Sequence, residues 1–226
     1  MSELLHFTEH TLQEVALVIM AIVYTLRIRW LFSFKGGRER QAPTGAADTN
    51  PRKGFIYSWA AIAMPWTMES TRTKKFFYAQ FIIFHIGVTL AILLSFIIPY
   101  APSLLANNPI LILIIQIFIG AAFLIGCWRL IRRMTNVYVR AISSPDDYFS
   151  LAMLTTWFGL GVITEAYIYG VTAVQNELIL VAYLLLTSFF LLYVPFSKIS
   201  HYLYYPFTRI WIGRALGHRG SYPVNK

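Results

Sequence analysis

Five long apolar runs constrain the fold of this chain more than any other feature. Each is about 20 residues long, the length of a helix that crosses the hydrocarbon core of a bilayer. The runs are Leu12–Trp30, Phe76–Pro99, Pro109–Trp128, Tyr148–Tyr169 and Leu178–Ser197. Composition agrees, because 57% of the residues are hydrophobic and only 13% are charged, unlike an average soluble protein. The sequence therefore predicts an all-α integral membrane protein with five transmembrane helices in a bundle.

The positions of the 19 Lys and Arg residues predict how the bundle is oriented. They fall into three groups, Arg27–Lys75, Arg129–Arg140 and Lys198–Lys226. With five spans the three groups lie on one side, and the positive-inside rule makes that side cytoplasmic. We expect the N-terminus outside and the C-terminus in the cytoplasm. The net charge of +9 calls for no nucleic acid, because anionic lipid or an acidic partner surface is available beside the spans.

Three functional regions follow from this topology. We expect an external N-terminus at residues 1–11, a membrane domain at 12–201 with a cytoplasmic linker at 35–75, and a cytoplasmic tail at 202–226. Within the linker, Gly54–Met68 is apolar and aromatic but too short to span, so we expect it along the inner membrane interface. A partner protein is expected to dock on the linker, this segment and the tail. The run Ser143–Asp147 predicts the capped start of the fourth helix.

Two histidines lie in or beside apolar runs: His85 in the second, and His201 just after the fifth. An imidazole buried in a bilayer is costly unless it is hydrogen-bonded or bound to a metal. Two of them on separate helices suggest the axial ligands of one haem iron, and Gly87 would let a porphyrin approach. The alternative is that each histidine hydrogen-bonds a neighbouring helix. The lone Cys127 excludes an internal disulfide and a multi-cysteine iron–sulfur cluster within this chain.

Basic side chains at the cytoplasmic edge are candidates to neutralise the haem propionates. They are Arg129, Arg132, Arg133 and Lys198. The two histidines are expected at different depths in the membrane, which makes a shared haem difficult. At 1.5 Å per residue His85 lies about 14 Å inside the cytoplasmic end of its span, whereas His201 lies just past the end of its own. Tilt, or a later end to the fifth helix, would close that gap.

Three local patterns carry a resemblance to a known family. They are Phe84-His85-Ile86-Gly87, then Pro195-Phe196-Ser197-Lys198 followed by His201 and Pro206, and the basic link from Arg132-Arg133 to Val139-Arg140-Ala141. On these patterns, and on a topology shared from Leu12 to about Arg209, the chain resembles the cytochrome b gamma subunit of respiratory nitrate reductases. The wider set includes membrane subunits of heterodisulfide-reductase-like and dissimilatory sulfite-reduction complexes.

The resemblance implies a respiratory electron-transfer subunit in the cytoplasmic membrane of a bacterium or archaeon. Electrons would pass between a menaquinone-type pool and an iron–sulfur subunit on the cytoplasmic face. Carried over from the family, His85 and His201 ligate the haem b nearer the cytoplasm. The family's outer haem ligands would fall at Ser95 and Tyr183, which suit a bis-histidine site poorly, so we expect one haem. The family is expected to oxidise quinol near its outer haem, so with one haem the position of the quinone site is undetermined.

Other polar residues allow two interpretations each. His6 and His10, near the first helix on the outer side, are either ligands of an outer redox centre or exposed terminal residues. Glu165, well inside the fourth run, is either on a proton path for quinone chemistry or a hydrogen-bonded carboxyl. We assign no catalytic residue, because no nucleophile–base pair, phosphate loop or zinc spacing is present. The alternative functions are a haemless membrane anchor for a redox complex and, more remotely, a transporter.

Overall fold

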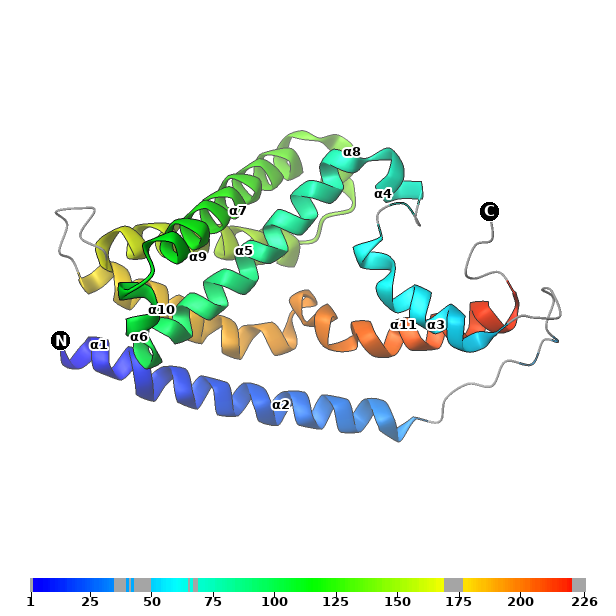
Figure 1. Ribbon diagram of the computed structural model, residues 1–226, viewed down its shortest axis with the longest axis horizontal. Coiled ribbons are helices and arrows are strands. Elements are labelled where there is room, and N and C mark those ends of the chain that lie inside the picture. Colours follow the sequence, from blue (N-terminus) through cyan, green and yellow to red (C-terminus); the bar gives the residue numbers. More distant parts are fainter. Residues whose placement is uncertain are drawn as a thin grey trace. The chain divides into compact units, whose positions relative to one another are not determined.

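The computed structural model describes residues 2–34, 40, 42, 50–64, 66, 69–168 and 177–220 (Figure 1). The side chains of residues 51, 70 and 165–168 lie outside this description. The described part of the chain consists of helices and turns, with no strand. This confirms the all-α class that the sequence predicts.

In the described part of the chain most of the helical elements are α-helices, with one π-helix and three short 3-10 helices. In chain order they are α1 (Glu3–His6), η1 (Phe7–Leu12, π), α2 (Gln13–Ser33), α3 (Pro51–Ala60), η2 (Ala61–Ala63), α4 (Glu69–Thr73), α5 (Lys75–Tyr100), α6 (Pro102–Ala106), α7 (Pro109–Thr135), α8 (Val137–Ala141), α9 (Pro145–Ile168), α10 (Glu177–Tyr193), η3 (Val194–Phe196), η4 (Lys198–Ser200) and α11 (His201–His218).

Four helical stretches among the described residues are long and apolar enough to cross a membrane. They are Glu3–Ser33, Lys75–Tyr100, Pro109–Thr135 and Glu177–Phe196, which coincide with the first, second, third and fifth predicted spans. The fourth predicted span coincides with α9, a 24-residue helix with Asp146 and Asp147 in its first turn. The protein is therefore a helical membrane protein, while the fifth span stays a prediction.

The first helical stretch begins at Glu3, two turns before the apolar run from which we predicted it. The Ser2 hydroxyl caps it by accepting a hydrogen bond from the backbone N–H of Leu5 at 3.2 Å. The side chains of Thr8 and Glu9 in this stretch are buried, although both are polar. The helix thus includes residues 3–11, which the sequence predicts to be the external N-terminus.

The chain divides into two compact units. Unit 1 comprises Met1–Thr25 and Gln80–Ser197, and unit 2 comprises Leu26–Ala79 and Lys198–Lys226. Each is described by itself below.

In unit 1 the helices approach one another at small residues, as helices do in membranes. A Cβ atom added at Gly87 on α5 would collide with the Cβ of Ala122 on α7. One added at Gly126 on α7 would collide with the hydroxyl of Thr155 on α9, and α7 and α9 run side by side (Figure 1). Large side chains fill the space between these crossings. The largest fully buried ones on α5, α7, α9 and α10 are Leu94, Ile115, Ile119, Phe158, Tyr183 and Leu184.

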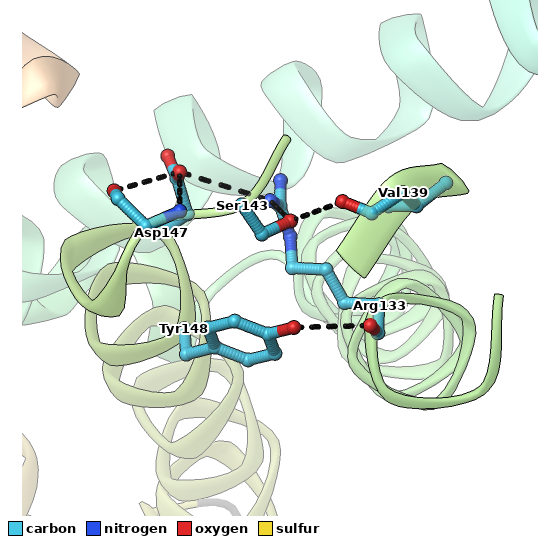
Figure 2. Close-up of polar contacts among 6 residues, drawn as sticks. Arg133, Val139, Ser143, Asp147 and Tyr148 are labelled. Carbon is cyan, nitrogen blue, oxygen red and sulfur yellow. Dashed lines mark hydrogen bonds and ion pairs between the residues drawn. The ribbon is translucent and has the colours of Figure 1, made fainter. Parts of the chain in front are cut away.

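A polar network ties α7 to α9 through the short helix α8 (Figure 2). The Arg133 guanidinium donates to the Ser143 hydroxyl at 2.7 Å and lies 3.9 Å from the Asp147 carboxylate. That carboxylate also accepts hydrogen bonds from the backbone N–H and the hydroxyl of Ser144, both at 2.8 Å. Asp147 thereby caps the N-terminus of α9, which confirms the predicted start of this helix. The Tyr148 hydroxyl donates to the Arg133 carbonyl at 3.0 Å.

In unit 2 the helices α3 and α11 meet backbone to backbone. A Cβ atom at Gly213 on α11 would collide with the Cα of Phe55 and the carbonyl of Gly54 on α3, and one at Gly54 would collide with Gly213 and Gly217. Asn50 starts α3, because its side-chain oxygen accepts from the backbone N–H of Arg52 at 2.9 Å. The segments in which we expected an interfacial piece and a tail therefore form a helix pair.

Candidate functional site

His85 lies in unit 1, in the middle of α5, and its side chain is exposed. Its Nδ1 atom is 2.7 Å from the carbonyl oxygen of Phe81, one turn earlier on the same helix. The Phe81 ring lies against the imidazole, with the two ring centroids 4.2 Å apart. The imidazole is therefore held by its own helix, at about 15 Å along it from Lys75.

His201 lies in unit 2 and is the first residue of α11. Its Nδ1 atom is 3.1 Å from the carbonyl oxygen of Lys198, and the side chain is exposed. Of the two explanations that the sequence allowed for the depth of His201, a later end to the fifth helix is wrong, because α10 ends at Tyr193, and tilt stays a prediction. Pro195 follows in a 3-10 turn, and Ser197 has an extended backbone, with φ −98° and ψ 171°. A new helix starts after this break, with His201 at its N-terminus.

The two histidines share one tautomeric arrangement. A carbonyl oxygen only accepts hydrogen bonds, so in each ring Nδ1 carries the hydrogen and donates it. In the neutral imidazole, Nε2 then holds the lone pair that can coordinate a metal. A backbone carbonyl that receives the second ring N–H is the usual support of a metal-ligating histidine. The donor chemistry of His85 and His201 therefore fits an iron ligand on each.

Gly87 has a structural explanation of its own. It faces Ala122 and the carbonyl of Phe118, so that it permits close packing of α5 on α7. Room for a porphyrin beside Gly87 stays a prediction from the sequence.

The basic candidates differ in their surroundings. The Arg129 guanidinium lies 4.6 Å above the ring of Phe84, the residue that precedes His85, and this is a cation–π contact. Arg132 follows on α7 and is half-buried. Arg133 is held by Ser143 and Asp147 in the network of Figure 2. Lys198 is exposed in unit 2, three residues before His201. The structure therefore brings Arg129 next to the segment of His85.

The two positions expected for outer haem ligands lie inside a packed core. Ser95 and Tyr183 are both fully buried. The Tyr183 hydroxyl donates to the Ala91 carbonyl on α5, and the ring stacks on Trp157 with an interplanar angle of 11°. Gln13 on α2 donates to the Ser95 carbonyl at 3.2 Å. These residues do not fit the ligand set of a second haem. Neither is a histidine, and both are enclosed by other residues of the core.

Sequence reasoning did not identify Trp157 and Gln13 as parts of this core. The indole nitrogen of Trp157 donates to the Thr187 hydroxyl at 2.9 Å, and Thr187 lies one turn after Tyr183 on α10. The sequence does contain the three residues that form this contact. Thr187 follows Tyr183 by four positions, and Trp157 lies on the preceding helix. A single sequence does not reveal which of its spans are neighbours, so this signal was not usable.

The N-terminal histidines form a small aromatic cluster with the end of α5. The rings of His6 and His10 have centroids 5.0 Å apart, and His10 lies edge-on to Tyr100 at 5.5 Å. The Tyr100 hydroxyl donates to the Glu14 carboxylate at 2.9 Å. Within the described residues no group of three or more His, Cys, Asp or Glu side chains could hold a metal ion. The side chain of Glu165, the proton-path candidate, lies outside the described residues.

Comparison with known proteins identifies the family. The model of the nitrate reductase gamma subunit family matches residues 53–179. A protein of Nitratidesulfovibrio vulgaris (strain Hildenborough), whose name states no function, is 24% identical over 173 residues, which cover 71% of this chain and 70% of that protein. No solved structure matches. Because the family match covers more than half of the chain, the protein belongs to the nitrate reductase gamma subunit family.

Proposed function

We propose that the protein is the haem-b electron-transfer subunit of a membrane-bound respiratory oxidoreductase complex. It would pass electrons between a menaquinone-type pool and an iron–sulfur subunit on the cytoplasmic face. The observation that carries the proposal is the shared arrangement of His85 and His201, each donating from Nδ1 to a carbonyl within four residues. Membership of a family of haem-containing cytochrome b subunits supports it.

His85 and His201 would be the axial ligands of one haem iron, each through Nε2. The carbonyls of Phe81 and Lys198 would hold the two rings in the ligating tautomer. The bound haem would supply reversible one-electron chemistry, and the chain would supply its binding, its orientation and its electrostatic surroundings.

Positive side chains would offset the negative haem propionates. Arg129 is the strongest candidate, because it is half-buried and lies over Phe84, beside His85 in the chain. Arg132 and Lys198 are further candidates. Arg133 contributes less, because the Asp147 carboxylate already offsets part of its charge.

A single haem is the expected content. The positions of the family's outer ligands hold Ser95 and Tyr183, and Trp157 and Gln13 complete the core around them. Quinone would then bind elsewhere than beside an outer haem, and Glu165 on α9 would be a proton acceptor for it.

The proposed topology is that of the charge pattern. Five spans, with α9 as the fourth, would place the N-terminus outside and the C-terminus in the cytoplasm of a bacterium or archaeon. The three basic groups would then face the cytoplasm, where the partner docks on the linker, on Gly54–Met68 and on the tail. The chain would carry no substrate chemistry of its own, and the partner would decide the terminal substrate.

The test is the haem-to-polypeptide ratio of the detergent-purified chain, measured as the pyridine haemochrome. We expect one haem b in the unmodified chain and none in His85→Ala or His201→Ala. His218→Ala is the matched control, because His218 belongs to α11 as well but to its last turn, and it should retain the haem. A haem-free unmodified chain would leave a membrane anchor, and two haems would direct attention to His6 and His10.

A further inference from the structure

Glu9, on the π-helix η1 of unit 1, is the most deeply buried acidic residue among those whose side chains are described. It is 6% exposed, and its carboxyl has no hydrogen bond or ion pair with another described residue. An ionised carboxylate in such surroundings is costly, because no partner in the protein offsets its charge. A buried acid within a membrane helix, and a π-helical turn as well, often mark a functional site.

Gln13, one helical turn later, provides a second observation. Its side chain is fully buried, and its Nε2 atom donates to the Ser95 carbonyl on α5 at 3.2 Å. Because a carbonyl only accepts hydrogen bonds, this contact fixes which end of the amide is the nitrogen. Gln13 Oε1 is therefore a buried acceptor, and it has no hydrogen-bond donor among the described residues. Buried acceptors are almost always satisfied in native proteins, so this oxygen calls for a donor nearby.

A proton on Glu9 would meet that requirement. Glu9 and Gln13 are four residues apart, so their side chains lie on the same side of the helix. A protonated carboxyl has an O–H to donate to Gln13 Oε1, directly or through one water, whereas an ionised carboxylate is only an acceptor. The two unpartnered groups therefore complement each other when Glu9 holds a proton.

Two histidines connect the surroundings of Glu9 with the solvent. His10 is half-buried and His6 is exposed, and their ring centroids are 5.0 Å apart. Both act electrostatically on the Glu9 carboxyl, as does Glu177 on α10, the helix against which η1 packs. An imidazole binds and releases protons near neutral pH, so these rings can pass a proton between the buried carboxyl and water.

Quinone chemistry gives such a group a task. Oxidation of a quinol to a quinone releases electrons and protons in equal number. The electrons would go to the haem iron, which takes up no proton, so the protons would pass to groups of the chain and from there to water. Reduction of a quinone requires the same path in reverse.

We propose that Glu9 is a proton-transfer residue of this subunit. Its carboxyl holds a proton against Gln13 and exchanges it with the aqueous phase through His10 and His6, and the protons of quinone chemistry travel by this route. The inference rests on the proposed function, because that function supplies the quinol. It adds an exit to the proton acceptor proposed at Glu165.

The first test is infrared absorption of the full chain in liposomes at neutral pH. Glu9→Gln should remove a C=O band of a protonated carboxyl, and in D₂O that band should shift, because its proton exchanges with solvent. Glutamine has the size of glutamate and can still donate to Gln13 Oε1, so the fold should survive. Gln13→Met removes the acceptor and should raise the frequency of the band, because the carboxyl loses its hydrogen bond.

Glu14→Gln is the matched control, because Glu14 lies on the same helical stretch but is exposed. It should leave the protonated-carboxyl band unchanged. A spectrum in which Glu9→Gln removes no such band would overturn the inference. So would a Glu9 band that does not shift in D₂O, because a carboxyl sealed from water has only a structural role.

The second test is the rate at which a soluble quinol reduces the haem of the full chain, measured by stopped flow. Glu9→Gln should slow this step about tenfold or more, as expected on loss of a positioned proton acceptor. Glu9→Asp keeps a carboxyl and should recover part of the rate, and Glu14→Gln should leave it unchanged. Reduction by dithionite releases no quinol proton and should be equally fast in all these chains. An unchanged quinol rate in Glu9→Gln would overturn the inference.

Haem content measured on the same preparations separates this inference from the proposed function. A haem-containing chain whose quinol rate ignores Glu9→Gln would refute the proton route and leave the cytochrome proposal standing. A haem-free chain would refute the cytochrome proposal, and with it the quinone role of Glu9. The infrared spectra need no haem, and they would still decide whether Glu9 holds an exchangeable proton.

Discussion

The two units of this protein are stabilised in different ways. In unit 1 large side chains interlock between helices, and buried polar groups such as Tyr183 and Trp157 bond to specific partners. In unit 2 the backbones of α3 and α11 meet directly at glycines. The charges differ as well, because unit 2 holds 15 of the 19 Lys and Arg residues and three of the ten acidic ones, for a formal net charge of +12, whereas unit 1 carries −3.

This contrast teaches that one chain can combine two modes of helix packing that respond differently to substitution. A side-chain core loses stability when a large residue is truncated. A backbone crossing loses it when a small residue is enlarged. The two proposed haem ligands are divided between these modes, since His85 belongs to unit 1 and His201 to unit 2.

The largest expected effect comes from truncating the core of unit 1. Tyr183→Ala removes a fully buried ring and should lower the free energy of unfolding by about 3–5 kcal/mol, the range for large aromatic truncations. Thermal unfolding in detergent, with hydrogen exchange by peptide, measures it. Tyr183→Phe is the control, which keeps the ring and should lose only about 1 kcal/mol. Equal losses in the two variants would contradict a side-chain core.

The second effect tests the backbone crossing in unit 2. Gly213→Ala places a methyl group against Phe55, Gly54 and Ser58 and should lower the stability of the α3–α11 pair by about 1–3 kcal/mol. Hydrogen exchange should rise in α3 and α11 while α7 and α9 stay protected. Gly120→Ala is the control, because the nearest atom to its added Cβ is Val162 Cγ2, at 3.9 Å. Faster exchange throughout both units would show that they do not unfold separately.

The third effect concerns the charges beside the proposed ligands. Arg129→Gln should lower the haem midpoint potential by tens of millivolts, because loss of a half-buried positive charge disfavours the reduced iron. Lys198→Gln is the matched change in unit 2 and should have a smaller effect, since Lys198 is exposed and screened by solvent. Potentiometric titration of the haem absorbance compares them. A larger shift from Lys198 would reverse this ranking.

The smallest effect tests the link between α7 and α9. Asp147→Asn removes the ion pair with Arg133 but keeps an oxygen that can accept from Ser144, so we expect a loss of about 0.5–1 kcal/mol. Both partners of the pair are partly exposed, so part of the loss should disappear at high salt. Thermal unfolding at two salt concentrations measures it, with Asp146→Asn as the comparison. A loss independent of salt would mean that the capping bonds, rather than the ion pair, matter.

Local signals were enough to predict much of the fold. The apolar runs located α5, α7, α9 and α10 to within a turn or two, because hydropathy over 20 residues is a property of consecutive residues. The start of α9 followed from Ser144 and Asp147, which contact each other across three positions. The motifs around His85 and His201 also pointed to the family that the comparison then identified.

The pairing of α3 with α11 was not predicted, although its signal is present. Gly213 and Gly217 form a small-xxx-small pattern on α11, and Gly54 and Ser58 form one on α3. Such a pattern indicates that a helix can be approached closely but does not name the helix that approaches it. The segments are more than 150 residues apart in the chain, so only the folded structure identifies the partner.

The sequence by itself determined the helical class of the protein and its main apolar helices, and it supplied the proposal of two histidine ligands, because these depend on composition and on short motifs. The tertiary structure alone decided three things. Ser95 and Tyr183 are buried in a core where Tyr183 stacks on Trp157. Arg133 is engaged by Asp147 while Arg129 lies over Phe84, and the side chains of Val137 and Tyr138 on α8 are exposed. Each depends on which helices pack against each other, and these contacts are made by residues that lie far apart along the chain.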